Sequence, residues 1–232
     1  MTESLVLSHA KWLNFVSPGF NNYSHINVKR VNLFTNGIDN IFTKKKYLKK
    51  KHLKRLTILY AGNIGLSQGL DLIVLPIAKR FKDKIVFKLI GDGSSVSLIK
   101  AGIVKDHIKN IKLIPPIKRI DLLGHYQDAD VLFLQLSDLP AFNNVIPSKI
   151  FDYGALEKPI LAGVKGTARD FMKENLSGAY LFDPGDTNAV EKYINFFLKG
   201  LPEVNHSKFK TNFERKRIMD KMLVSLINRF SQ

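Results

Sequence analysis

The chain has 232 residues, 45% of them hydrophobic, so it is long enough to bury one substantial core. It contains no cysteine, which excludes disulfides, thiolate nucleophiles and cysteine-rich metal sites. No apolar run reaches the roughly 18 residues that a membrane-spanning helix needs, and residues 1–19 lack the pattern of a signal peptide. These features predict a soluble or peripheral protein.

The formal net charge is +16, from 36 Lys and Arg against 20 Asp and Glu. Eight of the basic residues lie between Lys44 and Arg55, with no acid among them. Such a run is typical of a solvated linker and equally of a segment that contacts an anionic membrane surface. Nucleic acid is a less suitable partner, because only Tyr47 supplies an aromatic ring for base stacking there.

The amino-terminal region carries two short predicted strands, at 12–16 and 31–34, around a small loop and helix. This is too little material for a separate core. We therefore interpret residues 1–42 as a remnant of a larger domain, followed by a basic linker at 43–55.

Residues 56–203 alternate short β-branched runs with amphipathic segments, which predicts a doubly wound, Rossmann-like parallel sheet of about six strands. The strands are apolar throughout, as expected of strands that are buried on both faces. The predicted strands cover 56–60, 85–90, 111–114, 131–136, 159–162 and 179–182. The predicted helices cover 70–81, 95–101, 120–126, 148–156, 167–174 and a sixth segment that Asp186 caps and Gly200 ends. Residues 204–232 add one basic amphipathic helix, over about 209–230.

A first candidate site lies at Pro147 and Ser148, which begin a predicted helix in which Ser148 is placed to cap the unpaired amides. Lys149 beside that helix start suits a diphosphate. The carboxylate of Asp152, one turn further along, is suited to hydrogen bonds from ribose hydroxyls. The same spacing is also typical of an ordinary capped helix with a Lys149 to Asp152 surface ion pair, and the residues alone leave this alternative open.

Glycines supply two further candidates, directly after the first two strands. Gly62, Gly65 and Gly69 let a strand-to-helix turn approach a ligand closely, although they form neither G-x-G-x-x-G nor a P-loop. Gly91 and Gly93 flank an aspartate at the carboxyl edge where open α/β sheets bind ligands, or simply form a tight turn.

Other chemistries find less support in the sequence. Asp128 and Asp130 mimic a D-x-D metal motif, but their position just before an apolar strand favours a turn. The six histidines have no zinc-ligand spacing, and no serine lies in G-x-S-x-G.

Four segments, in this order and spacing, resemble the donor domain of family-four glycosyltransferases, which adopt the GT-B fold. The branch acting in bacterial polysaccharide synthesis, such as colanic-acid and O-antigen amino-sugar transferases, is the most similar. The segments are 60–63, 89–93, 129–131 and 147–153, with 16–20 and 36–39 resembling the end of the amino-terminal domain.

The resemblance implies a nucleotide diphosphate sugar donor, often UDP-linked, and transfer with retention of anomeric configuration. It implies no bound catalytic metal or other cofactor, and a glycan or lipid-linked acceptor in the cytoplasm or at the inner face of the cytoplasmic membrane. The catalytic groups are expected mainly in the amino-terminal domain, which would be nearly absent here. We therefore expect this chain alone to bind donor weakly and to transfer slowly or not at all, unless the missing half is a neighbouring chain.

The resemblance also assigns residues to the donor site. Asp152 takes the place of the glutamate that binds ribose, and Asn144 stands eight residues earlier, where the family has another glutamate. Asn63 and Gln68 replace the arginine and lysine that usually hold the phosphates, so Lys149 is the expected substitute.

Arg169, at a later helix start, is the second candidate cation, while Pro116 and Ile117 fall where the family's loop contacts the base through its backbone. The full predicted donor-binding set is Gly62, Asn63, Gln68, Gly91, Pro116, Ile117, Asn144, Ser148, Lys149, Asp152 and Arg169.

Two other functions remain open at this point. The chain could be a non-catalytic basic module that binds a membrane surface or nucleic acid, or another GT-B enzyme such as a UDP-sugar epimerase. Salt-dependent nucleic-acid binding without a response to UDP would favour the first, and a product formed from donor alone would favour the second.

Overall fold

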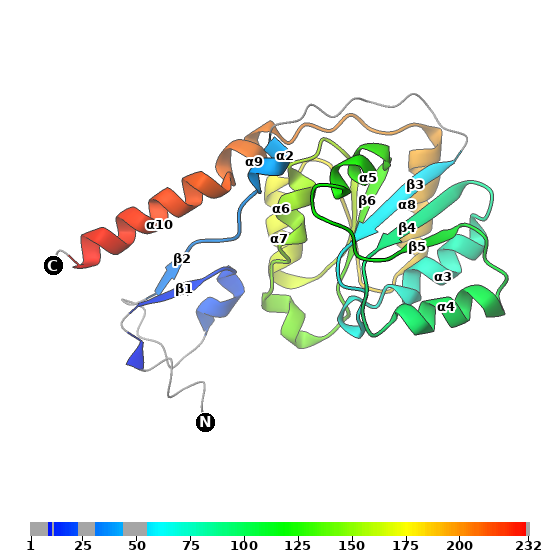
Figure 1. Ribbon diagram of the computed structural model, residues 1–232, viewed down its shortest axis with the longest axis horizontal. Helices are drawn as coiled ribbons and strands as arrows, with labels where there is room; N and C mark the ends of the chain where they lie inside the picture. The colour runs from blue at the N-terminus through cyan, green and yellow to red at the C-terminus, as the bar shows by residue number, and fades with distance from the viewer. Residues whose placement is uncertain (1–8, 11, 23–30, 44–54, 231–232) are drawn as a thin grey trace.

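The computed structural model describes residues 9–10, 12–22, 31–43 and 55–230. An α/β domain occupies the right of Figure 1, and a small pair of strands and the last helix extend to its left. Apart from Arg55, the basic run lies outside the described residues, so its role as a linker or membrane contact stays a prediction.

Six parallel strands form the central sheet, which confirms the predicted doubly wound topology. The spatial order is β5-β4-β3-β6-β7-β8, so the chain moves outward from the centre in one direction and then in the other. The reversal places the topological switch point between β3 and β6, where open α/β sheets bind their ligands. The strands are β3 (Leu56–Ala61), β4 (Ile85–Ile90), β5 (Ile111–Ile114), β6 (Val131–Gln135), β7 (Ile160–Gly163) and β8 (Ala179–Phe182).

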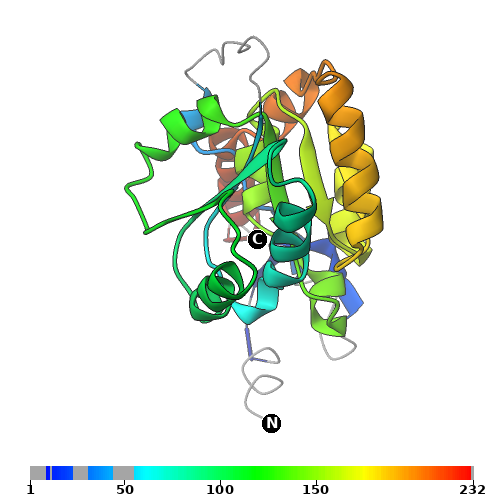
Figure 2. The same cartoon turned by 90° about the vertical axis from the view of Figure 1, so that its right-hand side faces the viewer.

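Helices cover both faces of the sheet (Figure 2). Alternation along β3 explains the two layers, because Ile58 and Tyr60 enter one hydrophobic core while Leu59 and Ala61 enter the other. The first layer consists of α3 (Asp71–Arg80), α4 (Val96–Lys105) and α8 (Thr187–Lys199). The second consists of α5 (Leu122–Asp128), α6 (Lys149–Gly154) and α7 (Gly166–Asn175).

Helix ends follow local signals at some positions and tertiary contacts at others. The side chain of Asp186 accepts hydrogen bonds from the amides of Asn188 and Ala189, both at 3.0 Å, which confirms the predicted cap of α8. In contrast, α6 has six residues instead of the nine predicted over 148–156. After α6 the amide of Leu156 donates to the carbonyl of Tyr153 at 3.0 Å, a tighter turn that leaves the α-helical pattern before the chain enters β7.

The predicted amino-terminal strands are present as a parallel pair, β1 (Leu13–Phe15) and β2 (Val31–Leu33). A 3-10 helix, η1 (Pro18–Asn22), follows β1. The next segment packs onto the α/β domain, because Ile38 and Phe42, beside and within α2 (Asn40–Thr43), are fully buried in its core.

The carboxy-terminal segment differs from the single helix predicted over 209–230. It forms α9 (Ser207–Asn212) and α10 (Arg215–Phe230), separated by a break. The amide of Ile38 donates to the carbonyl of Phe213 at 2.7 Å, and the amide of Arg215 donates to the carbonyl of Ile38 at 3.2 Å. These long-range bonds occupy backbone groups at the point of the break, which local sequence patterns cannot reveal. Within the described ranges, no helix combines the length and apolarity needed to cross a bilayer.

Candidate functional site

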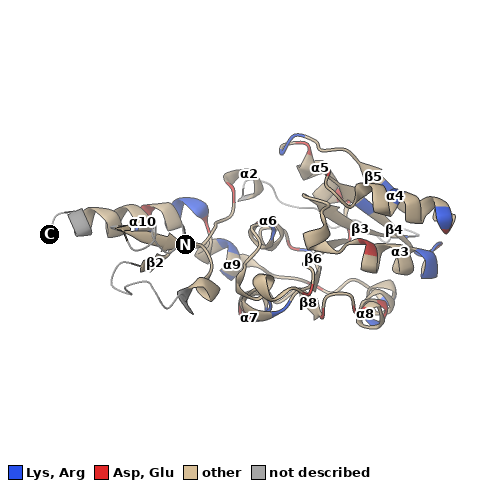
Figure 3. Cartoon of the chain, turned by 90° about the horizontal axis from the view of Figure 1, so that it is seen from below, with Lys and Arg blue, Asp and Glu red and all other residues tan. Residues whose placement is uncertain are grey.

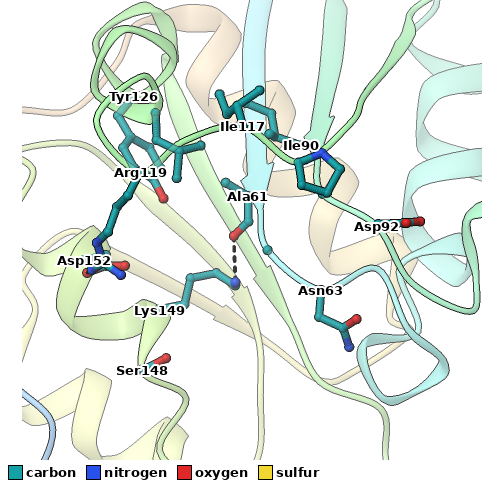
Figure 4. A pocket seen from close by; sticks show the side chains of 14 residues that line it. Ala61, Asn63, Ile90, Asp92, Ile117, Arg119, Tyr126, Ser148, Lys149 and Asp152 are labelled. Carbon is teal, nitrogen blue, oxygen red and sulfur yellow. Dashed lines mark hydrogen bonds and ion pairs between the residues drawn. The ribbon is translucent and has the colours of Figure 1, made fainter.

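A cavity of about 450 Å³ opens at the carboxyl ends of β3 and β4, facing α6 and the loop after β5 (Figure 4). It lies at the ligand-binding edge expected of this topology. Eight of the predicted donor-site residues line it, although they come from segments as much as 90 positions apart: Gly62, Asn63, Gly91, Pro116, Ile117, Ser148, Lys149 and Asp152.

Backbone forms one wall of the cavity because two glycines meet there. Gly62 and Gly91 have φ values of +144° and +145°, a region that residues with a side chain rarely adopt. The amide of Gly62 donates to the carbonyl of Ile90 at 2.8 Å, which holds the two turns together. A Cβ atom on Gly91 would lie 1.9 Å from the carbonyl oxygen of Gly62, so a side chain at position 91 would push the turns apart.

The side chain of Lys149 crosses from α6 to this glycine wall. Its Nζ donates to the carbonyl of Ala61 at 2.6 Å and lies 4.9 Å from the ring centroid of Tyr60. Burial lowers the pKa of Lys149 to about 8, while the charge of Asp152 acts in the opposite direction. Among the residues that the structure describes, none pairs a carboxylate with this ammonium at ion-pair distance. A half-buried cation without a paired carboxylate favours the binding of an anion beside it.

Asp152 is paired with Arg119, not with Lys149, which corrects the surface ion pair considered from the sequence. Nη2 of Arg119 lies 2.8 Å from Oδ1 of Asp152, and Nε of Arg119 lies 3.3 Å from Oδ2 of Asp39. Burial raises the pKa of Asp152, and the positive charges of Arg119 and Lys149 oppose that shift. The Asp152 carboxylate thus lines the cavity while the guanidinium of Arg119 holds it in place.

Ser148 lines the cavity but does not cap α6, contrary to the prediction. Its backbone is already helical, with φ −56° and ψ −27°, and its hydroxyl makes no capping hydrogen bond to the first turn. A capping side chain needs an extended backbone to reach those amides. With six residues α6 has only a short dipole, so the charge of Lys149 is the main attraction for an anion at this helix start.

Three predicted residues lie outside the cavity. Gln68 is the last residue of the 3-10 turn η3 (Leu66–Gln68). Its Oε1 accepts hydrogen bonds from Nδ2 of Asn63 at 2.9 Å and from the amide of Gly65 at 3.0 Å. The uncharged side chains of Gln68 and Asn63 are therefore bonded to each other within the glycine loop.

Asn144 and Arg169 lie outside the cavity lining, so their assignment to the donor site stays a prediction. The carbonyl of Asn144, at the end of η4 (Pro140–Asn144), accepts from the hydroxyl of Ser17 at 2.5 Å. Nη1 of Arg169 lies 2.5 Å from Oδ1 of Asp183, in an ion pair away from the cavity lining. In this structure the cation of Arg169 is therefore engaged by Asp183 and not by the cavity.

Sequence reasoning missed Arg119 and Tyr126, which also line the cavity. Arg119 follows Ile117 by two residues, so the predicted base-contacting loop was the available signal, but no spacing connects it to Asp152.

Asp130 has the structural role expected of a turn residue, since its Oδ2 accepts from the amide of Thr57 at 2.7 Å. No group of three or more His, Asp or Glu side chains in the described part of the chain is arranged to hold a metal ion.

Comparison with known proteins places this geometry in a family. The family model described as "Glycosyl transferases group 1" matches residues 42–212. The curated protein "Probable glycosyltransferase WbjE" of Pseudomonas aeruginosa is 26% identical over 137 residues, which are 59% of this chain and 34% of that protein. These matches confirm the resemblance found in the sequence.

Solved structures show the same fold at low identity. Anabaena HepE in complex with UDP matches 97% of this chain and 65% of its own, with a TM-score of 0.77 and 13% identity. The lipopolysaccharide outer core galactosyltransferase WaaB matches 95% of this chain and 62% of its own, with a TM-score of 0.71 and 13% identity. The α/β domain is therefore the carboxy-terminal domain of a GT-B glycosyltransferase fold, and the chain spans less than two thirds of the length of these relatives.

Proposed function

The chain belongs to the group 1 glycosyl transferases, and on that premise we propose that it binds a UDP-linked sugar and takes part in transferring that sugar with retention of anomeric configuration. The observation that carries the proposal is the half-buried ammonium of Lys149, 2.6 Å from the carbonyl of Ala61 and facing the turn at Gly62. A diphosphate supplies the negative charge that this ammonium lacks.

The rest of the cavity suits the remaining parts of a nucleotide. Asp152 lies on the same helix as Lys149, where its carboxylate can accept hydrogen bonds from ribose hydroxyls. Ile90, Pro116 and Ile117 supply an apolar end of the cavity for a base. HepE, which shares the fold, has been solved in complex with UDP, and this supports uridine as the nucleoside to test first.

The proposal extends to the acceptor and to location. We infer a glycan or lipid-linked acceptor of cell-surface polysaccharide, as WaaB is described as acting on the lipopolysaccharide outer core. Basic residues lie in the first turn of α10 and at the far end of the domain near α3 and α4 (Figure 3), and we infer contact with anionic lipid from them. Sedimentation with vesicles containing anionic lipid would detect that contact. Loss of binding at high salt is the expected signature.

Isothermal titration calorimetry tests the proposed donor. The wild-type chain is titrated with UDP, UDP-glucose, GDP and ADP, and we expect the uridine nucleotides to bind most tightly. Asp152→Asn should weaken UDP by about tenfold, because a hydrogen bond to a charged group is worth about 1.5 to 3 kcal/mol. Asp183→Asn is the matched control, since Asp183 pairs with Arg169 away from the cavity. Absence of binding to all four nucleotides, together with salt-dependent DNA binding, would instead favour a basic binding module.

A further inference from the structure

Arg119 connects three parts of the chain from the edge of the cavity. It lies in the loop between β5 and α5, and its guanidinium bridges Asp152 on α6 and Asp39 ahead of α2. The guanidinium also lies 5.4 Å from the ring centroid of Phe42, which is fully buried. Three separate contacts therefore fix the orientation of this one side chain.

Asp152 is a carboxylate that depends on its neighbours to remain charged. Its side chain is only 18% exposed, so desolvation favours the protonated form and raises its pKa. The groups that face it are Arg119, Lys149 and Arg215, which stabilise its charge, and Asp39, which opposes it. Arg119 is the largest favourable influence and the one in direct contact.

We propose that Arg119 is a positioning residue, which holds the Asp152 carboxylate charged and oriented for hydrogen bonds from the hydroxyls of a nucleoside. This inference rests on the proposed function, since it names how the nucleoside part of the donor is recognised. It assigns no phosphate to Arg119, because two carboxylates already engage its guanidinium. Lys149, whose ammonium lies at the turn of Gly62, is the residue assigned to the diphosphate.

The arrangement makes a prediction that separates Arg119 from a phosphate ligand. A residue that acts through Asp152 affects uridine and UDP by the same factor, whereas a phosphate ligand affects UDP alone. In addition, its effect disappears when Asp152 has already been neutralised, because interacting residues are not additive.

The experiment measures affinities of the full chain for UDP by calorimetry and for uridine by competition with UDP. We expect Arg119→Gln to weaken both ligands by about tenfold, and to add nothing in the Asp152→Asn background. Uridine carries no titrating phosphate, so its affinity across pH 4.5 to 7.5 reports the protonation of Asp152. Because the charge of Arg119 lowers the pKa of Asp152, the midpoint of this affinity change should move to higher pH in Arg119→Gln. Arg119→Lys, which keeps the charge, should retain most of the wild-type pH profile.

Arg80→Gln is the matched control, because Arg80 pairs with Glu191 outside the cavity and is 47% exposed against 48% for Arg119. A loss in Arg119→Gln confined to UDP, an equal further loss in the Asp152→Asn background, or an unmoved pH midpoint would each overturn the inference. Failure of the wild type to bind UDP or uridine would overturn the proposed function itself. Wild-type binding with an unaffected Arg119→Gln would overturn this inference alone.

Discussion

The ammonium of Lys149 and the carbonyl of Ala61 lie 2.6 Å apart, so a helix on one face of the sheet is joined to the last residue of the central strand. The bond leaves further N–H groups of the ammonium directed at the turn that begins with Gly62. Because Ala61 is held by the sheet, the position of the charge is set before any ligand binds. Preorganisation of this kind reduces the free-energy cost of binding an anion.

Lys149→Met should weaken UDP by about 10- to 100-fold while leaving uridine nearly unchanged, because only the phosphates lose a charged partner. The melting temperature should change little, since loss of the hydrogen bond to Ala61 is offset by removal of a half-buried ammonium. Calorimetry and thermal unfolding measure the two effects.

Lys158→Met is the control for this change, because Lys158 also donates to a backbone carbonyl, that of Gln127 at 3.2 Å, but lies outside the cavity lining. It should leave the UDP affinity at the wild-type value. Equal losses for uridine and UDP in Lys149→Met would contradict the assignment of the diphosphate to Lys149.

The affinity for UDP should depend on pH near 8, because burial lowers the pKa of Lys149 to about 8. The ammonium is protonated below that pH and neutral above it, so the affinity should fall as the pH rises from 7 through 8 to 9.5. Titrations from pH 7 to 9.5 measure this, with Lys149→Met expected to be flat across the same interval. A wild-type affinity that does not change up to pH 9.5 would show that the charge of Lys149 is not used.

Much of the fold could be predicted from the sequence because local patterns determine it. The apolar runs at 56–60 and 131–136 identify buried strands, and the parallel topology then brings their carboxyl ends to one edge. The resemblance to family-four glycosyltransferases then assigned Gly62, Lys149 and Asp152 to one site at that edge, and the structure places all three on the same cavity.

The remainder depends on contacts between distant segments. The break between α9 and α10 follows from hydrogen bonds to Ile38, which lies far away in the sequence. Arg119 and Asp152 are 33 residues apart and carry no shared spacing, so their ion pair could not be predicted. Likewise, the prediction for Arg169 required knowledge of Asp183, a carboxylate that the next strand brings beside it.

Gly91→Ala should destabilise the chain by about 1 to 3 kcal/mol, because a side chain there is strained at φ +145° and collides with the backbone of Gly62. It should also weaken UDP, since the cavity wall must shift. Gly124→Ala is the matched control, because Gly124 lies within α5 and an added Cβ meets no atom within 4 Å. That variant should gain about 0.5 to 1 kcal/mol. Urea unfolding of both proteins provides the comparison, and equal effects would exclude a special role for the turn at position 91.

His206 should make the stability of the chain depend on acid. The side chain is buried, with Nδ1 at 3.0 Å from the carbonyl of Leu156 and Nε2 accepting from the amide of Gly178 at 3.3 Å. Burial lowers the pKa of His206 below its usual 6.5, so the neutral ring is the folded form. As the pH falls, His206 is protonated in the unfolded chain before it is protonated in the folded chain. The stabilisation that the neutral ring contributes is therefore complete above pH 6.5 and is lost as the pH falls toward the lower pKa of the folded chain.

His206→Gln removes this titration while keeping a polar side chain of similar reach. We expect it to be less stable than the wild type by about 1 to 2 kcal/mol at pH 7.5, where the histidine bonds are intact. The difference should shrink as pH falls from 6.5 to 5, at no more than about 1.4 kcal/mol per pH unit, which is the limit for one proton. Urea unfolding of both proteins at several pH values measures that difference, and because the carboxylates titrate alike in both, their contributions cancel. A difference that stays constant from pH 7.5 to 5 would mean that His206 takes up its proton equally in the folded and unfolded chains.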